Sequence, residues 1–296
     1  MSMYDGRSSA SDPAQPSNAR ALEDALAPFE EGLRLQLRSA DDILRDAAAR
    51  KQMAKRSKTV LPVLALGALC AGLVWLDPAY QTETVSTAIG QRATVHLHDG
   101  SILTLNTGSQ VTVAMHLRSR RMTLVHGEAL FDVAHAPIRA LERPFKVTAN
   151  RTMVHDIGTV FNVRTRDTGV DVSVLHGRVR VEAEDGMSRE LNAGQAAATR
   201  DGHLSSADVR SDAADWRDGR LVLNGTPLRD VVEEIQRYRQ TPVILQEGSI
   251  GDIRVSGQFE LSRLDQLIDL LPSLTPVEVQ RRPDGSVRID ARPVRR

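Results

Sequence analysis

Histidine and cysteine are the side chains here that most readily hold a metal ion, but their spacing is not that of a metal site. His96 and His98 stand two positions apart in an alternating segment, which places both rings on one face of a strand. No cysteine or carboxylate accompanies them at the spacing of metal ligands. We therefore expect ordinary surface histidines, no metal site and no other cofactor.

The short motifs of common enzymes are also missing from the sequence. It contains no glycine-rich phosphate loop, no nucleophile elbow and no spaced pair of carboxylates, so an independent enzyme is not expected. Lys+Arg and Asp+Glu number 38 each, which removes the overall basic excess of a nucleic-acid-binding protein. We expect no direct contact with nucleic acid.

An uncharged apolar run, TVLPVLALGALCAGLVWL, divides the chain at residues 59–76. As a helix it would be about 27 Å long, close to the hydrocarbon thickness of a bilayer. Asp77 follows the run, and five cations precede it: Arg50, Lys51, Lys55, Arg56 and Lys58. The positive-inside rule then predicts a single transmembrane helix with the N-terminus in the cytoplasm and the C-terminus outside.

Two other roles for this run fit less well. A cleaved signal peptide would begin near the N-terminus, whereas many polar residues come first here and the run ends in Leu76-Asp77-Pro78. A lipoprotein anchored at Cys70 would have a small residue where this chain has Leu69. Because Cys70 is the only cysteine, the external part must be held by core packing rather than by disulfides.

The segment before the run divides into a disordered start, residues 1–18, and a helical tail, residues 19–58. The start is rich in Ser, Ala, Pro and Asp without periodicity, so it lacks the apolar surface needed to fold. Pro28 favours an early break in the tail, and Ser39 with Asp42 resembles a helix cap, which would divide the tail into two short helices. The tail carries one apolar stripe, which a partner protein, a second copy of the chain or the membrane surface must cover. The stripe consists of Leu22, Leu26, Phe29, Leu33, Leu37, Ala40 and Leu44.

Residues 77–204 change to the alternating pattern of strands, which predicts an all-β domain. A three-residue loop, His98-Asp99-Gly100, would pair Val95 with Leu103. Residues 124–127, LVHG, are echoed at 174–177 by VLHG, which predicts a repeated strand–turn–strand unit in a solenoid-like or sandwich arrangement. The strand-like runs are 94–97, 102–105, 111–115, 122–125, 129–133, 145–148, 160–163, 170–175 and 179–181.

A polar linker, residues 205–218, leads to a small α/β domain at residues 219–292. The pattern there predicts a βαβ unit and its duplicate, closed by a hairpin over Asp284-Gly285. The first helix would have Thr226 as its cap and Pro227 as its first residue. The second helix would be capped by Ser262.

A series of motifs along the external part carries a family resemblance. In the β-domain these are Asp99-Gly100-Ser101, Leu105-Asn106, Ser109, Arg121, Gly127-Glu128-Ala129, Phe131, Pro144-Phe145-Lys146-Val147, the run HDIGTVFNVR at 155–164, Gly177, Val179, Gly194 and Gln195. The series resembles the FecR family of transmembrane regulators, which control extracytoplasmic-function sigma factors during iron or haem-siderophore uptake. The last domain is similar to the secretin and TonB short N-terminal (STN) module, most clearly in LNGTPL at 223–228.

The resemblance implies an inner-membrane anti-sigma factor with a short helical cytoplasmic tail, one transmembrane helix, an all-β periplasmic domain and a small STN-like α/β domain. The tail would bind the sigma factor through Leu22, Leu26, Phe29, Leu33 and Leu37. The signalling domain of a TonB-dependent receptor would add a strand at Leu221, Leu223, Ile253 and Val255. Envelope proteases would then release the tail.

The resemblance also implies a reactive peptide bond. In some family members the pair matched here by Gly158-Thr159 cleaves itself through an N-to-O acyl shift. The Thr159 hydroxyl would attack the Gly158 carbonyl, and His155 would assist proton transfer. The alternative interpretation is a tight strand entry with Phe161 and Val163 buried.

The tail departs from the family pattern, because only 58 residues precede the apolar run and none is tryptophan. A second function therefore stays open, a membrane-anchored scaffold that binds a secretin or receptor without transcriptional output. A periplasmic hydrolase using some of the histidines is the least favoured interpretation.

Overall fold

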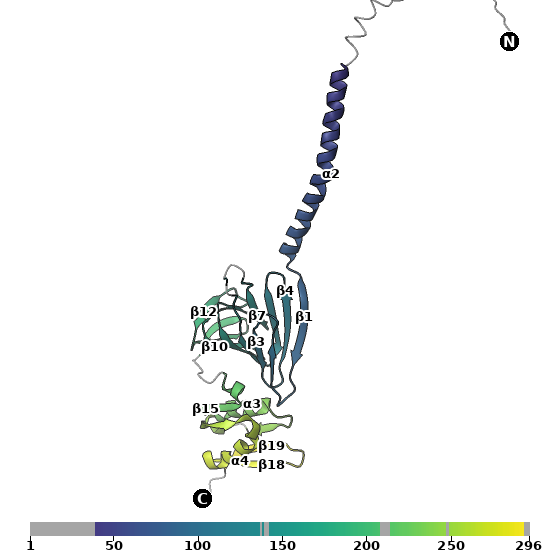
Figure 1. Cartoon of the computed structure of the whole chain (residues 1–296). Helices are drawn as coiled ribbons and strands as arrows, with labels where there is room; N and C mark the ends of the chain where they lie inside the picture. The colour runs from purple at the N-terminus through teal and green to yellow at the C-terminus, as the bar shows by residue number, and fades with distance from the viewer. Residues whose placement is uncertain (1–38, 137, 139–141, 208–213, 247–248, 293–296) are drawn as a thin grey trace, which may run out of the picture. The chain divides into compact units, whose positions relative to one another are not determined.

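The computed structural model describes residues 39–136, 138, 142–207, 214–246 and 249–292, without the side chains of residues 40, 52–62, 206, 207 and 249. Its first element is helix α2 (Ala40–Leu76), 37 residues long (Figure 1). Ser39 caps this helix, because the backbone N–H of Asp41 donates to Ser39 Oγ at 3.3 Å, and the acidic Asp41 and Asp42 favour its first turn. The predicted cap at Ser39 is confirmed, whereas residues 1–38, with most of the predicted stripe, lie outside the described residues.

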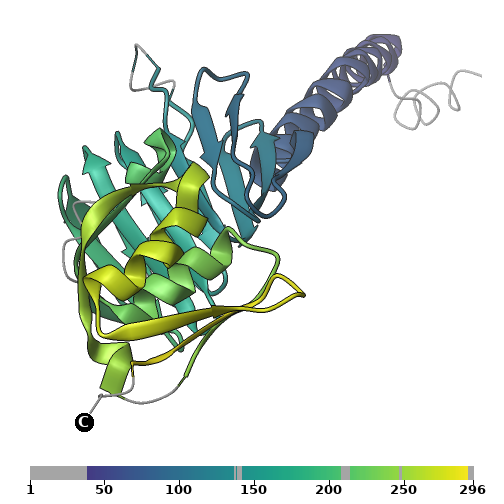
Figure 2. The same cartoon turned by 90° about the horizontal axis from the view of Figure 1, so that it is seen from below.

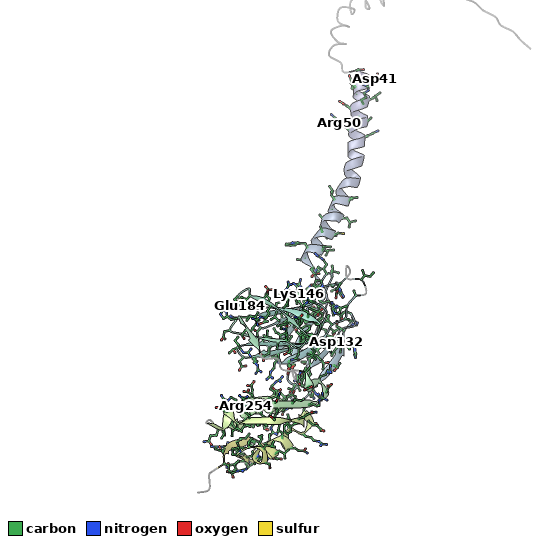
Figure 3. All side chains as sticks on the ribbon, turned by 90° about the vertical axis from the view of Figure 1, so that its left-hand side faces the viewer. Asp41, Arg50, Asp132, Lys146, Glu184 and Arg254 are labelled. Carbon is green, nitrogen blue, oxygen red and sulfur yellow. The ribbon has the colours of Figure 1, made fainter. Side chains whose placement is uncertain are left out.

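The described side chains of α2 are exposed, as Figure 3 shows for Asp41 and Arg50 near its start. Exposure is also high in its apolar half, where Trp75 is 85% exposed. Among the residues that the structure describes, no helix is long and apolar enough to cross a membrane. The predicted span begins with residues 59–62, whose side chains lie outside the described set, and it stays a prediction.

Beyond α2 the chain forms two sheets of seven strands. The first contains, in spatial order, β1 (Ala79–Ser86), β4 (Gln110–His116), β5 (Arg120–His126), β7 (Phe145–Ala149), β8 (Thr152–Asp156), β11 (Arg178–Glu182) and β12 (Ser188–Asn192). The second contains β14 (His203–Ala207), β13 (Ala196–Arg200), β10 (Gly169–His176), β9 (Val160–Arg166), β6 (Glu128–Asp132), β3 (Ile102–Leu105) and β2 (Ala93–His96). Within these two sheets all described pairs are antiparallel except β5 with β7, which is parallel.

Alternating apolar side chains from both sheets fill one core, so this domain is a sandwich. At its centre Phe131 stacks on Phe161 with ring centroids 5.3 Å apart and meets the edge of Phe145 at 6.1 Å. The predicted all-β fold is confirmed, and of the two arrangements left open the sandwich is correct. The predicted register is also confirmed, because Val95 pairs with Leu103 and Gly100 takes a left-handed φ of 87° in the loop between β2 and β3.

The two echoed motifs are corners at which the chain passes from one sheet to the other. Gly127 lies between β5 of the first sheet and β6 of the second, and Gly177 lies between β10 of the second and β11 of the first. Both have positive φ, 90° and 75°. A Cβ atom on Gly177 would lie 1.7 Å from the carbonyl oxygen of Gly158, so only glycine fits this corner. The repeat therefore predicts a real feature, a crossing between sheets rather than a hairpin.

The C-terminal part contains two βαβ units in series. The first is β15 (Arg220–Pro227), α3 (Leu228–Arg237) and β16 (Val243–Leu245), and the second is β17 (Arg254–Glu260), α4 (Leu264–Leu274) and β18 (Val277–Arg281), followed by β19 (Val287–Ala291). β15 pairs with β17, and β19 lies between β16 and β18. Three short 3-10 helices, η2 (Asp215–Asp218), η3 (Ser249–Asp252) and η4 (Leu261–Arg263), fill the connections. Figure 2 shows this part from below, with its two helices in green and yellow.

The predicted helix starts in this part are wrong by a few residues. Thr226 and Pro227 continue β15, opposite Val255 and Arg254, so α3 begins at Leu228 without a side-chain cap. Ser262 lies inside η4, and α4 begins only at Leu264. In both places pairing and packing with distant segments override the local capping signal.

The sandwich and the C-terminal part have separate cores within one compact unit, residues 73–296. A small third cluster connects them, in which Trp216 of η2 packs with Leu130 of β6 and Leu261 of η4. The outer face of the second sheet therefore meets the C-terminal part.

The corner at Gly177 gives a direct test of this fold. We expect Gly177→Ala to destabilise the protein far more than Gly186→Ala, because both glycines have φ near 80° but nothing lies within 4 Å of a Cβ at Gly186. Gly186→Ala should cost only the left-handed conformation, about 1–2 kcal/mol. Urea denaturation of both variants measures the difference, and equal losses would contradict the crossing at Gly177.

Candidate functional site: a cavity beside a buried ion-pair network

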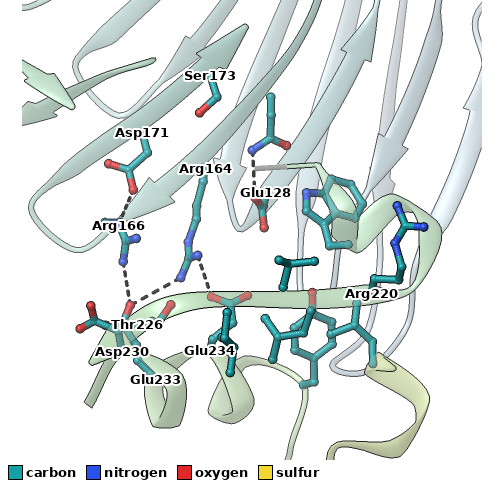
Figure 4. A pocket seen from close by; sticks show the side chains of 17 residues that line it. Glu128, Arg164, Arg166, Asp171, Ser173, Arg220, Thr226, Asp230, Glu233 and Glu234 are labelled. Atoms are coloured by element: carbon teal, nitrogen blue, oxygen red, sulfur yellow. Dashed lines mark hydrogen bonds and ion pairs between the residues drawn. The ribbon is translucent and has the colours of Figure 1, made fainter. Parts of the chain in front are cut away.

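A cavity of about 310 Å³ lies between the second sheet of the sandwich and the C-terminal part (Figure 4). On the sheet side it is lined by Glu128, Asn162, Arg164, Arg166, Asp171 and Ser173. Strand alternation explains this polar wall, because the residues between them, such as Phe161, Val163 and Val172, point into the sandwich core. On the other side the cavity is lined by Trp216, Arg220, Leu221, Val222, Leu223, Thr226, Asp230, Glu233, Glu234, Tyr238 and Leu261.

Glu128 is the hub of the network beside this cavity, and its side chain is only 5% exposed. Arg237 Nη2, from the end of α3, lies 2.7 Å from Glu128 Oε2. Asn106 Nδ2 donates to the same oxygen at 2.8 Å, and Asn162 Nδ2 donates to Oε1 at 2.9 Å. A buried carboxylate is tolerated only when paired in this way. Burial lowers the pKa of Arg237, but the charges of Glu128 and Glu234 outweigh it and raise that pKa.

Two further arginines of the sheet reach α3, as Figure 4 shows. Arg164 Nη1 lies 2.7 Å from Glu234, and Arg166 Nη1 lies 2.7 Å from Glu233. Burial raises the pKa of the Glu234 carboxyl, but the positive charges of Arg237 and Arg164 outweigh it, so its pKa lies below its usual value. The Glu234 carboxyl is therefore ionised at neutral pH, and the two ion pairs hold α3 against the sheet.

Uncharged hydrogen bonds complete the contact. The Tyr238 hydroxyl donates to Asn106 Oδ1 at 2.9 Å, and the Thr107 hydroxyl donates to the carbonyl oxygen of Arg237 at 3.0 Å. Burial, followed by the charge of Glu234, raises the pKa of Tyr238, which keeps the phenol neutral. Tyr238 therefore acts as a donor and not as a base.

One buried acceptor in the cavity wall has no donor. Asn162 is 4% exposed, and its Oδ1 has no hydrogen-bond partner among the described residues. The amide cannot simply be turned over, because the Glu128 carboxylate requires the NH₂ group at its present place. An unsatisfied buried acceptor costs about 1–3 kcal/mol.

Within the described residues, no group of three or more His, Cys, Asp or Glu could hold a metal ion. His96 and His98 are exposed on β2 and in the loop after it, in agreement with the expectation of surface histidines.

The predicted reactive pair has a different neighbour from the one expected. Thr159 is 4% exposed, and its hydroxyl donates to Asp156 Oδ1, which also accepts the backbone N–H of Gly158 at 3.1 Å. Burial raises the pKa of Asp156, although these two hydrogen bonds oppose the shift. His155 instead lies 3.4 Å from Glu182, because consecutive strand residues face opposite sides. The structure thus places Asp156, and not His155, at the Thr159 hydroxyl.

Two other sites were predicted, the sigma-binding stripe and the receptor edge. The stripe lies outside the described residues, and the side chains of the receptor edge lie in a core. The stripe residues are Leu22, Leu26, Phe29, Leu33 and Leu37. At the receptor edge β15 pairs with β17, and the C-terminal core takes up the side chains of Leu221, Leu223, Ile253 and Val255. A partner strand there would use backbone groups rather than these side chains.

Sequence reasoning missed the ion-pair network, although it singled out three of its members for their motifs. The motifs that contain Glu128, Asn162 and Arg164 indicate no function for these three residues, and no motif contains Arg237. A local signal exists only on β9, where polar Asn162 and Arg164 alternate with buried Phe161 and Val163. Such alternation shows that the strand has a polar face opposite its core face. It does not identify the residues that pack on that polar face.

Comparisons with known proteins agree with the fold. Residues 83–180 match the family model described as FecR protein. Two crystal structures of a candidate anti-sigma factor from Parabacteroides distasonis ATCC 8503 are similar to the chain, each with a TM-score of 0.60. They are 21% and 22% identical in sequence, and each likeness covers 71% of this chain and 99% of the other, which shows a shared fold. No curated protein matches the chain. Residues 83–180 of the chain are therefore a FecR domain, and the two solved structures share its fold.

Proposed function

We propose that this protein is an anti-sigma factor that controls an extracytoplasmic-function sigma factor. The match of residues 83–180 to the FecR family carries the proposal. It is supported by the two similar structures, which are of a candidate anti-sigma factor, and by the apolar stripe of the tail. A stripe without a core of its own would fold against the sigma factor.

In this proposal the protein is anchored in the bacterial inner membrane by residues 59–76. The cations just before the run would keep the tail in the cytoplasm, where the sigma factor is. The FecR domain and the C-terminal part would then lie in the periplasm. Cutting of the chain by envelope proteases would free the tail, because a single helix transmits little by rigid movement.

The periplasmic signal would come from the signalling domain of a TonB-dependent receptor during iron or haem-siderophore uptake. The C-terminal part would be the receiving module, of STN type, with β15 and β17 offering backbone edges. The Glu128 network would carry the effect onward, because it joins α3 of this module to the FecR domain. A partner that moves α3 away from the sheet would have to break these ion pairs.

A second activity, self-cleavage between Gly158 and Thr159, is favoured by the contact between Asp156 and Thr159. The Thr159 hydroxyl oxygen would attack the Gly158 carbonyl carbon, forming an ester while the C–N bond breaks. Asp156 would take the hydroxyl proton and pass it to the amine that leaves, and water would then hydrolyse the ester. Gly158 has a positive φ of 108°, a backbone conformation that glycine adopts readily and other residues rarely do.

The sigma factor contact can be tested by co-purification with the full chain. We expect Leu26→Asp combined with Leu33→Asp to abolish capture of the sigma factor, because both leucines belong to the predicted stripe. Gln36→Asp adds a charge to the same segment off the stripe and should leave capture unchanged. Equal capture by the parent and the double variant would rule out the stripe as the contact.

The network can be tested by comparing two arginines of α3. Arg237→Ala leaves Glu128 buried and without its cation, so we expect a loss of about 3–5 kcal/mol in the free energy of unfolding. Arg229→Ala removes an exposed ion pair with Asp252 and should cost less than about 1 kcal/mol. Chemical denaturation measures both, and similar losses would show that the Glu128 network does not hold the module.

Self-cleavage can be tested by mass spectrometry of the purified full chain. We expect fragments that meet between Gly158 and Thr159, their loss in Thr159→Ala, and their return in Thr159→Ser, which keeps the hydroxyl. Asp156→Asn should slow the reaction, whereas His155→Gln should not. An intact parent chain, or the same fragments from Thr159→Ala, would exclude the acyl shift.

A further inference from the structure

We propose that the cavity between the FecR domain and the C-terminal part binds a small organic cation, an ammonium or guanidinium group on an apolar body. The bound molecule would contact β9 of the FecR domain and α3 and η2 of the C-terminal part. It would therefore strengthen the contact between the two parts. The cavity shares Leu221 and Leu223 with the predicted receptor edge and Glu128 with the ion-pair network, but this proposal does not depend on either of those roles.

The first observation is the unpartnered oxygen of Asn162. Its amide nitrogen is fixed by Glu128, and its Oδ1 has no donor among the described residues, although the side chain lines the cavity and is buried. An acceptor in this position selects a ligand with an N–H or O–H group.

The second observation is a carboxylate without a cation. Five carboxylates line the cavity, from Glu128, Asp171, Asp230, Glu233 and Glu234, together with three guanidinium groups, from Arg164, Arg166 and Arg220. All three arginines already have carboxylate partners. Arg237 and Arg200, which do not line the cavity, also pair with Glu128 and Asp171. Asp230, in the first turn of α3, has no ion-pair or hydrogen-bond partner within the described part of the chain. A free carboxylate and a free acceptor in one cavity together favour a donor group that carries positive charge.

The third observation is the apolar part of the wall. Trp216, Leu221, Leu223 and Leu261 line the cavity, and Trp216 is 6% exposed. An apolar body of the ligand would pack there, and the indole face also attracts a cation. A purely polar ion would leave this part of the cavity uncovered.

Fluorescence of the full chain tests this site directly. The chain has two tryptophans, so Trp75→Phe leaves Trp216 in the cavity wall as the only one. We titrate this variant in detergent with benzylamine, benzyl alcohol and benzoate, which share a ring and differ in charge. We expect saturable change with benzylamine, much weaker change with benzyl alcohol and none with benzoate.

Substitution of the free carboxylate supplies the control. In the same background, Asp230→Asn should weaken benzylamine binding about tenfold, the loss expected for one charge-assisted hydrogen bond. Asp132→Asn removes an exposed carboxylate of β6 that does not line the cavity, and it should bind as tightly as the parent. Thermal unfolding with the same compounds should show benzylamine alone raising the transition temperature. No saturable binding, equal affinity for benzylamine and benzyl alcohol, or unchanged affinity in Asp230→Asn would each overturn the proposal.

Discussion

The buried carboxylate of Glu128 is the constraint on which the arrangement of this protein depends. A charge with 5% exposed side-chain surface is stable only if every lone pair that faces the protein is satisfied. Its three donors come from the turn after β3, from the outer face of β9 and from the end of α3. One side chain therefore fixes a loop, a sheet and a helix that are distant in the sequence. Burial in low dielectric makes such a network strong when complete and costly when a member is missing.

The glycine corner before Glu128 explains how this carboxylate reaches its place. Gly127 ends β5 and lets the chain enter the second sheet, where Glu128 is the first residue of β6. A Cβ at Gly127 would lie 2.3 Å from Ser109 Oγ, and that hydroxyl accepts the backbone N–H of Glu128 at 2.9 Å and donates to its carbonyl oxygen at 3.1 Å. The close approach that only glycine permits thus positions the hub of the ion-pair network. The repeated His-Gly pair in the sequence thus marks a corner that also positions Glu128 to bind α3 of the C-terminal part.

The sequence predicts local patterns of this fold well and distant pairings poorly. Strands with alternating apolar residues, such as Ile102–Leu105 and Val170–Leu175, were predicted because the core face shows in the residue types. β1 and β12 were missed because they are outermost strands with mostly exposed side chains, so neither shows an apolar face. Arg237 and Glu128 are separated by 109 positions, and no local pattern connects them. Asp156 was within reach, because an aspartate two residues before a glycine turn commonly accepts backbone and hydroxyl hydrogen bonds.

The chemistry of the contact between the two parts decides what kind of signal it can carry. Its ion pairs, its hydrogen bonds and the polar wall of its cavity make it more polar than a domain core, as is typical of contacts that domains can break. Full separation would hydrate Glu128, Glu234 and Arg237, which recovers much of the electrostatic energy lost. A molecule that binds only the docked form stabilises that form by RT ln(1 + [L]/Kd), and a partner that binds only the separated form shifts the balance the other way. Ligands that bind only one of these two forms would therefore shift the balance between them without any change in the two cores.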